Sequence, residues 1–151
     1  MFYEVVLWTH ASAMLAALVL FVVSEILLIL AQKYRSSLAR SALRANSIGG
    51  MLTGIGVLGG ITLVYVGGWP LLTPWLLASL ALIAVLMTVG RLFVSPWQAK
   101  IQSALSADIS GAPLKTFISD KTALIGRAAM IALFVLIVAL MTEKPDLGPW
   151  L

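Results

Sequence analysis

The sequence lacks most of the side chains on which soluble enzymes and metal sites are built. It contains no cysteine and a single histidine, His10. The absence of cysteine excludes disulfides, thiolate-bound zinc, iron–sulfur clusters and a cysteine nucleophile. A lone histidine excludes a multi-histidine metal site within one chain. The sequence motifs of serine hydrolases, phosphate-binding loops and dinucleotide-binding folds are missing as well.

Charged side chains are equally scarce. Of the 151 residues, 11% are charged and 61% are hydrophobic, and the mean hydropathy is +1.05. Soluble chains carry roughly a quarter charged residues, whereas residues 45–90 contain none at all. The composition therefore excludes a soluble domain and predicts a protein whose main partner is the lipid bilayer.

Four stretches are long and apolar enough to cross a bilayer, which takes about 20 helical residues. They cover about residues 5–31, 47–66, 74–94 and 122–142. The second begins near Asn46 or Ser47, either of which can cap a helix start. Gly67-Gly68-Trp69-Pro70 breaks the chain, and Thr73-Pro74 restarts it, so the second and third spans form a tight hairpin. Ser119 and Asp120 offer a cap for the fourth span. The predicted fold class is all-α: one polytopic domain with a four-helix transmembrane bundle.

A short amphipathic helix is predicted over about residues 97–107. Its apolar residues recur at helical spacing: Trp97, Ile101, Ala104 and Leu105. This pattern is typical of a helix that lies in the membrane interface. A bent continuation of the third span beyond Pro96 fits the same pattern.

The basic residues predict the orientation of the spans. Seven of them lie between the first and second spans or ahead of the fourth span: Lys33, Arg35, Arg40, Arg44, Lys100, Lys115 and Lys121. The positive-inside rule predicts that both segments lie on the cytoplasmic side of a bacterial inner membrane. Both termini and the Gly67–Thr73 turn are then outside, in the periplasm. Topology and lipid headgroups account for the net charge of +4 without nucleic acid as a partner.

Three ionisable residues fall inside predicted spans: Glu25, Arg91 and Arg127. Burying a charge at bilayer depth costs on the order of 3 kcal/mol, so such residues are rarely incidental. With the predicted topology all three lie at a similar depth near the cytoplasmic face. They form either a structural ion-paired cluster or a site whose positive surplus holds an anionic group such as a carboxylate or phosphate.

Glycines crowd the second span. Gly50 and Gly54 are four residues apart, as are Gly56 and Gly60. This spacing puts small residues on one helical face, where another backbone can approach closely. The face serves packing within one bundle, a subunit interface, or a groove for a flat ligand.

His10 lies near the outer end of the first span. It either forms a hydrogen bond to a neighbouring helix or ligates haem iron, with the small Ala13 and Ala17 leaving room for the macrocycle. One histidine per chain permits five-coordinate iron, a His/Met site or a bis-histidine site across a dimer. Met14, one turn along the same helix, cannot reach the opposite face of the iron. Glu25 lies about 22 Å further along the helix and belongs to a separate zone.

The layout of these features resembles that of a known group of proteins. The features are His10 in the first span, a glycine-rich second span, Gly-Trp-Pro at the outer turn, and Arg127 followed by Lys144-Pro145. The group comprises small four-helix bacterial inner-membrane proteins, including the HemJ-type protoporphyrinogen oxidases and the copper-resistance D domain. Through residues 67–76 the sequence is most similar to members of unassigned function. The resemblance implies homo-oligomers that bind haem b, with His10 as the ligand.

Three functions are consistent with the sequence. The first is a haem-b-binding inner-membrane protein with a redox or tetrapyrrole-related role. The second is a non-enzymatic accessory subunit that docks into a larger membrane complex through the face carrying Gly50, Gly54, Gly56 and Gly60. The third is a small-solute or ion carrier built around Glu25, Arg91 and Arg127.

Overall fold

The structure is a computed structural model that describes residues 1–32, 36–107 and 112–143. Within these ranges every regular element is a helix. In chain order they are α1 (Phe2–Ala31), α2 (Ser36–Gly67), α3 (Pro74–Val89), the π-helical turn η1 (Gly90–Val94), α4 (Ser95–Ser106), α5 (Ala112–Ile118) and α6 (Lys121–Glu143). Four helical runs of the described chain are long and apolar enough to cross a membrane: α1, α2, the run from α3 to α4, and α6. The predicted all-α, four-helix fold class is confirmed.

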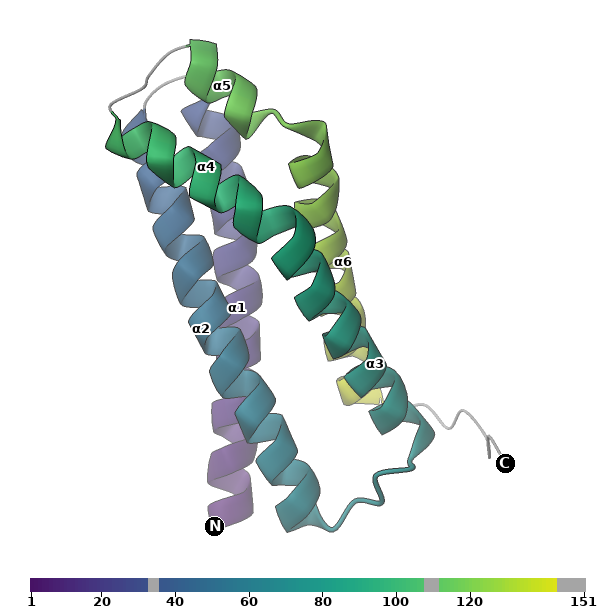
Figure 1. The fold of residues 1–151 in the computed structure, drawn as a ribbon. Coiled ribbons are helices and arrows are strands. Elements are labelled where there is room, and N and C mark those ends of the chain that lie inside the picture. Colours follow the sequence, from purple (N-terminus) through teal and green to yellow (C-terminus); the bar gives the residue numbers. More distant parts are fainter. Residues whose placement is uncertain (33–35, 108–111, 144–151) are drawn as a thin grey trace.

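The helices form two pairs, α1 with α2 and α3 with α6 (Figure 1). Contacts between α1 and α6 join the pairs in the middle of the bundle. The start of α1, the turn between α2 and α3 and the end of α6 lie at one end, and α4 and α5 cover the other (Figure 1). Which end faces the cytoplasm stays a prediction from the basic residues.

The turns of the bundle follow the predicted break points. Gly68 adopts a φ of +64°, a conformation that glycine accepts without steric cost. Pro74 occupies the first turn of α3, where its missing N–H is not needed. The predicted cap of α6 is confirmed, because a carboxylate oxygen of Asp120 accepts the backbone N–H of Thr122 at 2.9 Å.

Helix α2 begins at Ser36, well ahead of the start near residue 47 predicted for the second span. Ala39, Ala42 and Ala45 are buried along the added turns, and the Ser24 hydroxyl of α1 donates to the Ala42 carbonyl at 2.9 Å. A residue that is suited to N-capping does not mark the start of a helix when buried apolar residues continue on its N-terminal side. The basic residues predicted for a loop, Arg40 and Arg44, therefore lie on a helix.

Helix α4 continues α3 through η1 and bends across the end of the bundle (Figure 1). Pro96 lies in its first turn and cannot supply the N–H that a straight helix would need, and the widened π turn precedes it. The four predicted apolar residues of α4 are all buried, in a cluster with residues of α1, α2, α5 and α6. The bent continuation is therefore what the chain adopts, and the apolar face of α4 covers protein.

Candidate functional site

The buried ion pair between Glu25 and Arg127 joins α1 to α6. The Arg127 Nε atom lies 2.8 Å from a carboxylate oxygen of Glu25. Arg127 is only 6% exposed, the most buried charged residue of the described chain. Two charges from different helices thus neutralise each other inside the bundle.

Trp97 of α4 forms the other side of the arginine site. The Arg127 guanidinium carbon lies 4.1 Å from the centre of the Trp97 ring, within the range of a cation–π contact. The Trp97 indole N–H donates to the Phe117 carbonyl at 2.8 Å, which holds the ring in place. The sequence pattern indicates only that Trp97 lies on an apolar helix face, and it gives no sign of the contact with Arg127.

The ion pair leaves part of the guanidinium without a directed hydrogen bond. Nε is close to Glu25 but not aligned with it for hydrogen bonding, and neither Nε nor Nη1 of Arg127 has a hydrogen-bond partner among the described residues. Charge attraction and the Trp97 ring therefore stabilise Arg127.

Arg91 does not join this pair. It is exposed on η1, whereas its neighbour Gly90 faces α6, where an added Cβ would lie 3.5 Å from the sulfur of Met130. Successive helical residues point in different directions, so equal depth in a membrane does not make Arg91 and Arg127 neighbours. The structure brings together two of the three predicted cluster residues, and the positive surplus proposed for a carrier is not assembled.

His10 connects α1 with α2. Its Nδ1 atom lies 2.7 Å from the Gly56 carbonyl oxygen, and since a carbonyl only accepts, Nδ1 is the donor. In the neutral imidazole this leaves the lone pair on Nε2. Gly59 and Gly60 make room for the ring, because an added Cβ would lie 3.2 Å and 3.1 Å from His10 side-chain atoms.

The glycines of α2 divide into two faces. Gly56 packs against the Met14 side chain and Gly60 against His10, so this pair lies in the α1–α2 contact. At Gly50 and Gly54, an added Cβ would meet no described atom within 4 Å. The structure thus separates the two predicted Gly-x-x-x-Gly pairs: one packs inside the chain and the other is open.

The donor atoms present fit one axial haem ligand. Nδ1 of His10 donates to a backbone carbonyl that orients the ring, and Nε2 carries a lone pair that can bind a metal. Metal-bound histidines share this arrangement. Ala13 and Ala17 are buried in the protein, so the space predicted for a macrocycle beside their methyl groups is filled. In residues 1–32, 36–107 and 112–143, no group of three or more His, Cys, Asp or Glu side chains is placed to hold a bare metal ion.

Comparisons with protein-family models, curated proteins and solved structures find no significant match to this chain. Fold and composition therefore define the class by themselves. Four apolar helices, with a buried ion pair and a histidine between helices, make this an integral multi-pass membrane protein.

Proposed function

We propose that this membrane protein binds haem b through Nε2 of His10, as a homo-oligomer of the bacterial inner membrane with a redox or tetrapyrrole-related role. The observation that supports the proposal is the hydrogen bond from His10 Nδ1 to the Gly56 carbonyl at 2.7 Å. Such a bond sets the tautomer and the ring orientation of a metal-binding histidine. It also connects two helices, and the two roles are compatible because they use different ring nitrogens.

The chain's own residues hold and orient the imidazole. Gly59 and Gly60 let the ring lie against the α2 backbone, and Met14 is directed at Gly56. Haem b bound at His10 would supply one-electron chemistry. Any second ligand would come from a methionine or from His10 of a second copy, because the chain has no other histidine. The haem would not use the space beside Ala13 and Ala17, which is filled.

The absorption spectrum of the purified full-length protein, prepared from haem-replete cells, tests this proposal. We expect a Soret band that is lost in His10→Gly and returns when imidazole is added, since free imidazole replaces the missing ligand. Ser12→Ala is the matched control, because Ser12 is exposed on the same helix and its hydroxyl bonds only within α1. A colourless protein that also fails to bind added haem would contradict the proposal, as would a Soret band that persists in His10→Gly.

A non-enzymatic subunit role is the second candidate, and the open glycine face favours it. Gly50 and Gly54 meet no side chain of the described residues, in contrast to Gly56 and Gly60. Exposed Met51, Ile55 and Leu58 lie on the same helix. A partner helix that packs closely on this face would contact small residues that make no packing contact within the bundle.

A further inference from the structure

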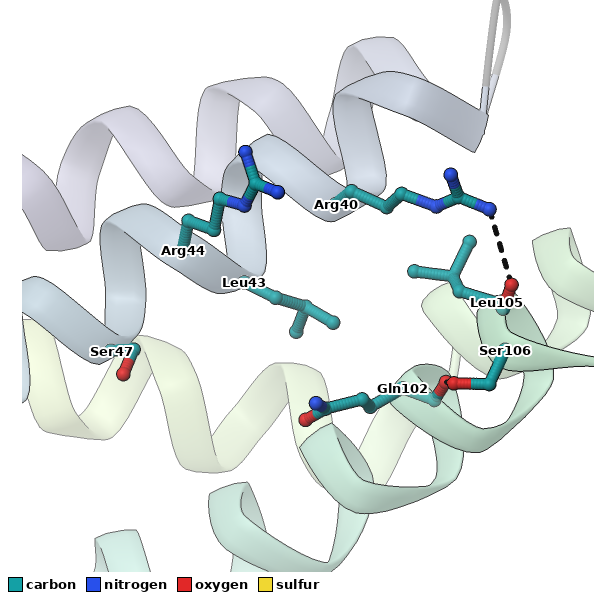
Figure 2. A pocket seen from close by; sticks show the side chains of 7 residues that line it. All are labelled: Arg40, Leu43, Arg44, Ser47, Gln102, Leu105 and Ser106. Atoms are coloured by element: carbon teal, nitrogen blue, oxygen red, sulfur yellow. Dashed lines mark hydrogen bonds between the residues drawn. The ribbon is translucent and has the colours of Figure 1, made fainter.

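A groove lies between α2 and α4 at the end of the bundle opposite the Gly67–Thr73 turn (Figure 2). Its volume is about 480 Å³, within the range of small-molecule sites. The polar side chains that line it are Arg40, Arg44 and Ser47 from α2 and Gln102 and Ser106 from α4. We name it the α2–α4 groove.

The groove presents positive charge over an apolar floor. Arg40 and Arg44 are one helical turn apart, and none of the described lining residues is acidic. Leu43 and Leu105 lie between the two helices, with the arginines on one side and Gln102 and Ser106 on the other (Figure 2). An occupant that fits must carry negative charge and also tolerate contact with hydrocarbon.

The two arginines differ in how they are held. A terminal nitrogen of Arg40 donates to the Leu105 carbonyl at 3.2 Å, which anchors its guanidinium across the groove (Figure 2). Arg44 forms no hydrogen bond or ion pair with another residue of the described chain and is exposed. Guanidinium groups present several N–H donors to phosphate oxygens, so the remaining donors of both residues are available to one phosphate.

The position of the groove favours a lipid as the source of that phosphate. Residues 45–90 carry no charge, so Arg40 and Arg44 are the last charged residues of α2 before its apolar part. Basic residues in this position are typical of the level of the headgroups. Basic pockets between membrane helices at this level are typical sites for anionic headgroups. We propose that the α2–α4 groove binds the phosphate group of an anionic phospholipid, with Arg40 and Arg44 as the binding residues.

Native mass spectrometry of the full-length protein tests this proposal, with phosphatidylglycerol and phosphatidylcholine of identical acyl chains as probes. We expect phosphatidylglycerol to be retained preferentially, and Arg44→Gln to reduce that preference about fivefold, the effect of one basic residue near a headgroup. Arg91→Gln is the matched control, because it removes an exposed positive charge outside the groove. Arg44 is exposed and forms no hydrogen bond or ion pair within the described chain, so we expect its loss to leave the bundle intact, which an unchanged thermal midpoint verifies.

Two outcomes would overturn the proposal. Equal losses in Arg44→Gln and Arg91→Gln would mean that the lipid responds only to total charge, and full retention in Arg44→Gln would exclude the groove. Glycerol phosphate, which has the headgroup chemistry without the acyl chains, distinguishes the source. If it binds in an Arg44-dependent manner while phosphatidylglycerol shows no preference, the groove holds a soluble phosphate and the lipid assignment is wrong.

Discussion

Arg127 is buried in an apolar interior because it has two neighbours of different chemistry. The Glu25 carboxylate neutralises its charge at 2.8 Å, and the Trp97 ring faces the guanidinium at 4.1 Å. A buried ion pair is weak evidence of net stabilisation, but the loss of one partner leaves an uncompensated charge. The three residues come from α1, α4 and α6, so the site connects both helix pairs with the helix that covers their ends.

Substitution of one charge should therefore destabilise the protein more than substitution of both. We expect Glu25→Gln to lower the free energy of unfolding by about 3 kcal/mol, because Arg127 stays buried and charged. The double variant Glu25→Gln, Arg127→Met should recover part of this loss. Unfolding in a denaturing detergent, monitored by circular dichroism, measures the free energy of unfolding of both variants.

Arg91→Gln is the control for the Glu25 prediction, since Arg91 is exposed and separate from the pair. It should leave the unfolding transition unchanged. If Glu25→Gln and Arg91→Gln behave alike, the ion pair does not contribute to the fold.

Between α1 and α2, contact depends on which glycines face the neighbouring helix. Gly49, Gly56 and Gly60 accept the side chains of Phe21, Met14 and His10. These contacts are spread along most of α2 and are extended at its start by the Ser24 bond to Ala42. The pairing is thus continuous along α1, whereas the face of α2 with Gly54 is left to lipid or to another chain.

Gly54→Leu and Gly56→Leu should separate packing within the chain from association between chains. We expect Gly56→Leu to lower the thermal midpoint, because even a Cβ there would overlap the Met14 side chain. Gly54→Leu should leave the midpoint unchanged, since the space is open, and should weaken any complex that uses this face. Size-exclusion chromatography with light scattering reports the second effect. Complexes that survive Gly54→Leu unchanged would count against the subunit interpretation.

The two ends of the bundle differ in charge (Figure 1). The end with α4 and α5 carries Arg40, Arg44, Lys100, Lys115 and Lys121, and the turn between α2 and α3 carries no charge. An even number of spans keeps the start of α1 and the end of α6 on one side. The positive-inside rule predicts that the α2–α4 groove faces the cytoplasm and that His10 lies near the outer surface.

Single cysteines can test this orientation directly, because the chain has none of its own. In intact cells, Leu72→Cys at the outer turn should react with a membrane-impermeant maleimide, and Lys100→Cys should react only after permeabilisation. Both positions are exposed in the structure, so differences in reactivity report sidedness and not burial. The reverse labelling pattern would invert the topology and place the groove outside.

Sequence patterns predicted the elements well where the signal is local. The glycine turn, the proline at the start of α3 and the Asp120 cap occur where they were expected. The start of α2 was placed too late, because Asn46 and Ser47 look like a helix start but lie in the middle of one. The candidate site was predicted as one cluster of Glu25, Arg91 and Arg127, whereas the structure pairs Glu25 with Arg127 and leaves Arg91 exposed.

By itself, the sequence determined that the chain is an α-helical membrane protein and where its chain turns. This follows because lipid offers no hydrogen bonds, so each span must be a continuous apolar helix that can be read from adjacent residues. Only the tertiary structure decided that Arg127 meets Glu25 and Trp97, that Gly56 packs while Gly54 stays open, and that Arg40 crosses to α4. Those contacts depend on how each helix is rotated about its axis and where it bends, which the packing of all the helices sets together.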